Sequence, residues 1–260
     1  MSPQHLYKYG QINKHCEERT EKLFTTPTLW FSSPAELNDP FECRPWMTGD
    51  GTTDQVMAFF VRMFRQKLPY SDEVTVRANA TAYYLEGRHR HPEIWNQVRV
   101  GLVSDFEKSV ALYCLSEVND EILMWSHYAD EHRGYCLIFD ASDSTPTFGT
   151  AQPVTYSKDL PAIDVFGDPP HVVANKALLT KYANWTYEKE WRIVDHDTGA
   201  GSHSYPVELL SGVIFGARMP TADRAKIQGW LRRRGHEVQL YEAIQSDRHF
   251  KLEVRVSDRM

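Results

Sequence analysis

The sequence lacks several signatures that would assign a protein to a common class at once. It has no apolar run near the roughly 20 residues that cross a bilayer, and its first residues carry no charged and then apolar leader. It also lacks a phosphate-binding glycine loop, a Gly-x-Ser-x-Gly elbow and any C-x-x-C pair among its 4 cysteines. These absences argue against a membrane-embedded protein, a P-loop enzyme, a serine hydrolase and a zinc knuckle, and we expect no metal site.

An excess of basic residues is also missing. Lysine and arginine together number 29, aspartate and glutamate 35, and the formal net charge is −6. Non-specific nucleic-acid binding depends on neutralising phosphates, so such binding would here need a local basic patch. The absence of a leader and of a disulfide framework predicts a reducing cytoplasm and no membrane partner.

Apolar residues are plentiful enough for a core. They make up 42% of the 260 residues, which fits one α+β domain spanning the whole chain. Strand-like and helical segments are mixed without strict βαβ alternation, which predicts a mixed, mainly antiparallel sheet rather than a doubly wound one. Val56, Phe59, Phe60 and Met63 recur at helical spacing, and residues from about 53 to 108 are predicted as a helical insertion. Residues 160–170, rich in proline, glycine and aspartate, are predicted as a loop.

A first polar motif lies between Trp30 and Phe41. Ser32 and Ser33 end a predicted strand at the mouth of a short helix, where hydroxyls and free backbone amides bind anions or polar ligand edges. Asn38 and Asp39 follow before a proline. The plainer interpretation is a capped turn in which these side chains bond their own backbone.

A second motif runs from Ser116 to Gly134. Met124 and Tyr128 share one face of a predicted helix, and His127 lies on another. His127 could act as an acid or base near neutral pH, although a lone histidine in an aromatic helix is more often a structural donor. Arg133, at the turn that follows, has the planar fork that suits phosphate.

A third motif, from Trp185 to Val194, carries paired carboxylates. If a strand covers this segment, Glu188, Glu190 and Arg192 lie on one face by period-two alternation. Two carboxylates beside an arginine can form an acid/base pair with separated pKa values. An exposed ladder of ion pairs is the alternative, and the neighbouring tryptophans and tyrosine argue against full exposure.

These motifs together resemble the bacterial domain-of-unknown-function family 2971. The resemblance extends from about residue 6 to residue 216, and the family label implies no activity. It rests on five segments, which are Leu6–Tyr9, Leu37–Phe41, Met124–Tyr128, His132–Gly134 and Glu188–Arg192.

The order of the motifs also resembles the ADP-ribosyltransferase fold. One branch of that fold has a basic residue on its first strand, a serine-rich second strand and a late Glu-x-Glu pair. Here Lys8 or Tyr9 takes the first place, although the family has an arginine there, and Glu188-Lys-Glu190 takes the last. The resemblance implies that NAD is the substrate, and that Lys8, Tyr9, Ser32 and Ser33 bind it. Asn38, Asp39, Tyr128, Arg133 and Arg192 are further candidate ligands.

Three functions remain open from the sequence. The first is NAD-dependent ADP-ribosyl transfer or NAD cleavage, with Glu190 as the catalytic carboxylate, Glu188 activating an unknown nucleic-acid or protein acceptor, and a toxin or phage-defence role by association. The second is a metal-independent nuclease or phosphodiesterase in which His127 and His132 exchange protons and Arg133 and Arg192 hold phosphate. The third is a non-enzymatic ligand-sensing or partner-binding module with a polar core network.

Overall fold

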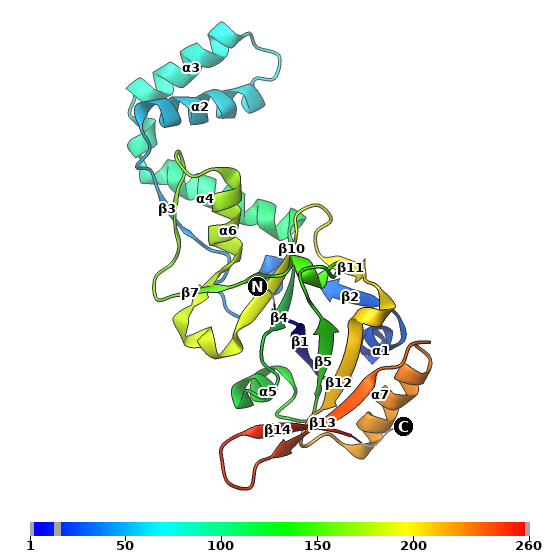
Figure 1. The fold of residues 1–260 in the computed structure, drawn as a ribbon. Coiled ribbons are helices and arrows are strands. Elements are labelled where there is room, and N and C mark those ends of the chain that lie inside the picture. The colour runs from blue at the N-terminus through cyan, green and yellow to red at the C-terminus, as the bar shows by residue number, and fades with distance from the viewer. Residues whose placement is uncertain (1–2, 13–16, 258–260) are drawn as a thin grey trace.

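The core of the protein is one mixed sheet of eight strands (Figure 1). The computed structural model describes residues 3–12 and 17–257. Neighbouring strands are antiparallel except for the parallel pair β12–β13, which confirms the predicted α+β class and its mainly antiparallel sheet. In their order across the sheet, the strands are β14 (Leu252–Val256), β13 (Gln239–Gln245), β12 (Leu210–Phe215), β5 (Tyr135–Asp140), β1 (His5–Gly10), β4 (Ala111–Ser116), β10 (Glu190–Asp195) and β6 (Gln152–Pro153).

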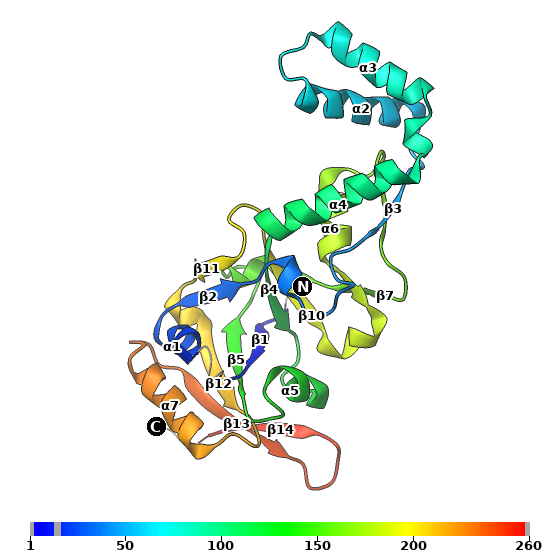
Figure 2. The ribbon, with the colours of Figure 1, turned by 180° about the vertical axis from the view of Figure 1, so that it is seen from behind.

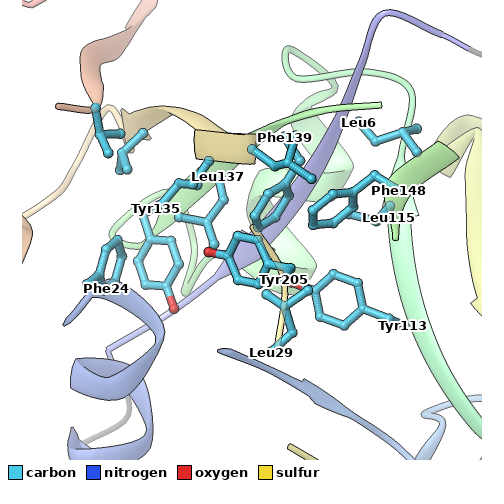
Figure 3. Close-up of a cluster of buried hydrophobic side chains, with 14 of the residues drawn as sticks. Leu6, Phe24, Leu29, Tyr113, Leu115, Tyr135, Leu137, Phe139, Phe148 and Tyr205 are labelled. Atoms are coloured by element: carbon cyan, nitrogen blue, oxygen red, sulfur yellow. The ribbon is translucent and has the colours of Figure 1, made fainter. Parts of the chain in front are cut away.

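The two faces of the sheet bury different clusters. On one face, Leu6, Leu137 and Phe139 pack in a large aromatic core that also contains Phe24 of α1 (Glu17–Thr25), as Figure 3 shows. α7 (Thr221–Arg232) and the ribbon of β2 (Thr28–Phe31) and β11 (Gly201–Ser204) cover this face. On the other face, α5 (Ile122–Tyr128) buries Trp125 completely against the sheet. Alternation along the strands supplies both cores.

A helical arm occupies the predicted insertion. It consists of α2 (Thr53–Lys67), α3 (Glu73–Leu85) and α4 (Pro92–Ser109), which confirms that residues 53 to 108 are mainly helical. Thr52 and Gln55 form a capping box where α2 begins. The α2–α3 hairpin projects beyond the end of α4, away from the sheet (Figures 1 and 2), and buries Phe60 and Val76 in a small core of its own.

The loop predicted over residues 160–170 is partly wrong. Residues Ala162–Asp164 form β8, which pairs in parallel with β3 (Trp46–Thr48). Phe166 is buried and packs edge-on against Phe59 of α2, with ring centroids 5.2 Å apart. Proline and glycine indicate turns. The apolar side chains Ile163 and Phe166 between them are nevertheless buried, so the segment is more ordered than its composition predicts. The segment continues through α6 (Pro170–Leu178) to β9 (Thr180–Tyr182), which pairs with β7 (Thr155–Ser157).

The sheet opens between β1 and β4. These strands pair at one register position, Tyr7 with Ser116. Beyond it, the ammonium of Lys8 donates to the backbone carbonyl of Cys114 at 2.8 Å. This side-chain hydrogen bond takes the place of the backbone hydrogen bonds that would otherwise join β1 and β4. Further along β4, Leu112 exchanges backbone hydrogen bonds with Ser32 at the end of β2. Residues from all three polar motifs, among them Ser32, Tyr128 and Glu190, lie beside this opening. Within the described residues, no helix combines the length and apolarity needed to cross a membrane.

Candidate functional site

Five charged side chains form a buried cluster where β10 begins. Lys181 of β9 donates to Glu188 at 2.5 Å and to Glu190 at 2.8 Å, and lies 3.2 Å from Glu42. Arg192 donates to Glu190 at 2.7 Å and also bonds Glu42. Each of the five side chains is at most 4% exposed. Three carboxylates thus share two cations, which leaves one excess negative charge when all are ionised.

The pKa values of the two glutamates of the third motif are shifted in opposite directions. Burial alone would raise the pKa of Glu190, but the charges of Arg192 and Lys181 outweigh it and lower that pKa to about 2. Burial raises the pKa of Glu188 above its ordinary value, although hydrogen bonds from Lys181 and Tyr128 oppose this. Glu190 therefore stays ionised, and Glu188 is the member of the pair that takes up a proton more readily.

Tyr128 connects the cluster to the first motif. Its hydroxyl donates to Glu188 Oε1 at 2.6 Å and accepts from the amide of Asn38 at 3.3 Å. Burial, followed by the nearby Glu188 carboxylate, raises the pKa of Tyr128, so the phenol stays protonated and can keep donating. Tyr128 of α5 and Asn38 from the turn after β2 therefore meet at the carboxylate of Glu188, just before β10 begins.

The backbone before β10 brings both glutamates inward. Glu188 ends a 3₁₀ helix, Ala183–Glu188, and Lys189 adopts left-handed torsion with φ of 42°. The strand begins only at Glu190, so Glu188 is not on the strand face that alternation predicted. Glu190 and Arg192 do share a face, as two residues in a strand should. The left-handed turn at Lys189, and not strand alternation, therefore places the Glu188 side chain in the cluster beside Glu190.

A cavity of about 230 Å³ lies beside the cluster, at the opening between β1 and β4. Distant parts of the chain meet there, and the pocket brings seven of the predicted site residues together. Its walls include Lys8, Tyr9, Ser32, Asn38, Tyr128, Glu188 and Glu190. Lys8 and Ser32 line the same cavity as the carboxylates, so a cation, a hydroxyl and two carboxylates share one space.

Two residues of the first motif serve the turn itself. The Ser33 hydroxyl accepts from the amide of Ala35, and Glu36 accepts from the backbone amide of Ser33. These bonds form the capped turn that the sequence offered as the alternative to a ligand site. Asp39 accepts from the backbone of Phe41 and from the indole of Trp185, both at 2.9 Å. Ser33 and Asp39 do not line this cavity and their polar atoms have structural partners, so its geometry gives no support to their predicted role as cofactor ligands; Asp39 lines a different, larger cavity.

The histidine and the turn arginine of the second motif lie apart from the cavity. His127 is exposed, with its ring 6.4 Å from those of Trp185 and Tyr187. Arg133 pairs with Asp130 at 3.1 Å and Glu131 at 3.0 Å on the surface. The cavity therefore gives no support to the predicted roles of His127 as a catalytic group and Arg133 as a ligand, because α5 turns another face to the cavity and Arg133 lies in the turn that follows the helix.

Arg192 has a structural place. It is fully buried, and its guanidinium donates to Glu190, to Glu42 and to the Leu178 carbonyl. No face of its fork is left for a ligand. The prediction that Arg192 binds a cofactor is corrected on that ground, since the same fork geometry that suits phosphate is occupied by carboxylates.

Glu42 and Lys181 are the two residues that sequence reasoning missed. Glu42 directly follows the first motif, and Lys181 lies in the short strand β9. Neither belongs to a repeated or spaced pattern, and a charged residue in a short segment is ordinarily a surface residue. The available signal was the excess of carboxylates over cations in the third motif, because a buried pair of glutamates beside one arginine needs a further cation.

A second cavity, of about 320 Å³, lies on the other side of Glu42 and Lys181. Apolar groups such as Phe41 and Leu160 line much of it, and it contains neither glutamate of the third motif. The Lys181 ammonium is engaged by the three cluster glutamates. The smaller cavity, which holds the hydroxyl, phenol and carboxylate groups, is therefore the better candidate for chemistry.

The chain is an α+β protein whose opened sheet holds a cavity of about 230 Å³ beside a buried carboxylate cluster. Residues 124–193 match the model of the family described as "Protein of unknown function (DUF2971)". This confirms the predicted resemblance, over a shorter span than expected, and the span includes Tyr128, Glu188 and Glu190. No curated protein and no solved structure matches the chain.

Proposed function

We propose that this protein is an enzyme that acts on a nucleotide, most concretely by NAD-dependent ADP-ribosyl transfer or NAD cleavage. The observation that carries the proposal is the convergence of Lys8, Ser32, Tyr128 and the two glutamates on one cavity. Those groups come from the first strand, the end of β2, α5 and the start of β10. We also propose a reducing cytoplasm as the compartment, in keeping with free thiols at Cys43, Cys114 and Cys136.

The separated pKa values of the glutamates suit two roles. In the proposed reaction, the bond between the anomeric carbon and the nicotinamide nitrogen breaks, and its electron pair leaves with nicotinamide. The excess negative charge of the cluster stabilises the sugar cation, with Glu190 permanently ionised. Glu188, whose pKa burial raises, then accepts the proton from the attacking acceptor or water. Pairs of carboxylates in contrasting environments commonly divide work in this way.

Nicotinamide release from NAD tests the proposal directly. The wild-type protein, incubated with NAD and with RNA, DNA or cell lysate as acceptor, should release nicotinamide. Glu188→Gln should lower the rate at least 100-fold, because general-base catalysis contributes about 10²–10⁴-fold. Glu253→Gln is the matched control, since Glu253 pairs with Arg255 on the surface. Equal rates in all three proteins, or no release by wild type with any acceptor, would remove the basis for the proposal.

A non-enzymatic binding module is the second candidate, and the saturation of the charge cluster favours it. Every cation in the cluster is engaged by carboxylates, as in a polar network that specifies a core. On that alternative, Glu188→Gln would change ligand affinity or stability without changing any turnover. The nuclease alternative draws less support, because His127 is exposed and Arg192 is enclosed, so the groups that it requires do not meet.

A further inference from the structure

The candidate cavity adjoins a second compartment at Lys8. Lys8, Tyr9, Trp30 and Tyr113 line both spaces. The second compartment, about 730 Å³, lies between β1, β2 and α1, and Arg19 is among its walls. The carboxylate compartment alone is smaller than the roughly 300–1,000 Å³ typical of ligand pockets, so a complete ligand would extend into the second one.

Two cations line this compartment without a carboxylate partner. The Lys8 ammonium donates to the Cys114 carbonyl and lies 4.8 Å from the centre of the Tyr113 ring. The Arg19 guanidinium lies 4.2 Å from the centre of the Trp30 ring. Within residues 3–12 and 17–257, neither has a carboxylate oxygen within ion-pair distance.

The acidic residues of the same compartment are already paired. Glu17 lies 3.0 Å from Lys226, and Glu18 lies 2.9 Å from Lys22 on the same helix. The charges left uncompensated in the compartment are therefore positive, in a chain whose net charge is −6. Cations left unpaired along one cleft of an acidic protein favour an anionic ligand there.

We propose that Lys8 and Arg19 bind the phosphate groups of a dinucleotide that spans both compartments, with a nucleoside on either side of Lys8. The cation–π contact with Trp30 holds the Arg19 guanidinium in place without using an N–H donor, and a guanidinium can donate to two phosphate oxygens at once. Lys8 lines both compartments, so its point charge sits where the two halves of the ligand join. The inference rests on the proposed function for the ligand's orientation, but the binding of phosphate does not depend on turnover.

Calorimetric titration with ADP-ribose, which has a diphosphate but no nicotinamide, tests this proposal. Arg19→Met should weaken ADP-ribose binding about tenfold or more, because a lost charge-assisted contact is worth at least one factor of ten in affinity. Arg19 is exposed on α1, so the substitution leaves the folded core in place. Nicotinamide riboside, which has no phosphate, should bind wild type and Arg19→Met equally. Arg255→Met, on the exposed surface of β14, is the control.

The possible outcomes separate this inference from the proposed function. ADP-ribose binding that depends on Arg19, in a protein that releases no nicotinamide, would support the phosphate compartment and contradict the enzyme. ADP-ribose binding that is unchanged in Arg19→Met would overturn the compartment, whatever the enzyme does. AMP binding as tightly as ADP-ribose would overturn the dinucleotide span, and the absence of any ADP-ribose binding would overturn the whole inference.

Discussion

At the scale of single residues, Arg192 holds the carboxylate cluster together. It is fully enclosed and bonds two of the three glutamates and a backbone carbonyl. Taking these charges out of water costs free energy that is recovered only while every partner remains. Such a cluster does little to increase stability overall, but it makes the loss of any one member severe.

We therefore expect Arg192→Met to lower the free energy of unfolding by about 3–5 kcal/mol, because it leaves Glu42 and Glu190 buried beside one remaining cation. Urea unfolding followed by circular dichroism measures this loss. Arg255→Met, at an exposed pair, should change the free energy by less than about 0.5 kcal/mol. A loss below about 1 kcal/mol in Arg192→Met would mean that the cluster is open to water.

Glu190 should also make stability depend on pH. Its pKa is lowered to about 2 in the folded protein, so its contribution is present above the ordinary carboxyl pKa and is lost as pH falls from about 4.5 toward 2. Glu188 acts in the opposite sense, because a raised pKa makes the folded state lose stability as pH rises. The difference in unfolding free energy between wild type and Glu190→Gln should shrink on acidification. A difference that stays constant from pH 7 to pH 3 would contradict the lowered pKa.

Among the elements, the helical arm contacts the segment after β8 through Phe166. Phe166 follows β8 and enters the core of the α2–α3 hairpin, beside Phe59 and Phe60. The hairpin projects from the molecule and has few other neighbours (Figure 2). Its local stability therefore depends strongly on this one aromatic contact.

Phe166→Ala should lower the free energy of local unfolding of the arm by about 3–5 kcal/mol, because a buried phenyl ring is lost from a small core. The stability of the sheet should not change. Hydrogen exchange should speed up at amides of α2 and α3 and stay unchanged in β5 and β12. Phe250→Ala is the control, since Phe250 is fully exposed in the turn between β13 and β14. Equal acceleration in the sheet would show that the arm and the core unfold as one unit.

Elements with strong periodicity were predictable, and those without it were not. Within residues 53–108, apolar side chains such as Val56, Phe59, Phe60 and Met63 recur at helical spacing. The structure has α2, α3 and α4 in this segment. β3 and β8 were missed, because each has three residues and pairs across more than a hundred positions of sequence. Three residues cannot establish a period, and their strand conformation comes from the partner.

At the scale of the whole molecule, the site is a product of topology. Lys8, Ser32 and Tyr128 could be proposed from local motifs, and the cavity brings them together. Glu42 and Lys181 could not, because nothing in their neighbours distinguishes them from surface charges. That His127 lies away from the cavity could not be predicted, because helical spacing defines which residues share a face but not which face turns toward the sheet.

A nucleotide bound in the opening between β1 and β4 would lie against Glu188. Hydrogen exchange with and without saturating NAD tests this placement most directly. We expect slower exchange at segments that line the carboxylate cavity, at residues 6–10, 30–32, 113–116 and 188–190, and, if the ligand extends to Arg19, also at residues 17–23 of α1. Slower exchange at residues 157–161 instead, around the cavity behind Lys181, or unchanged exchange throughout, would contradict this placement.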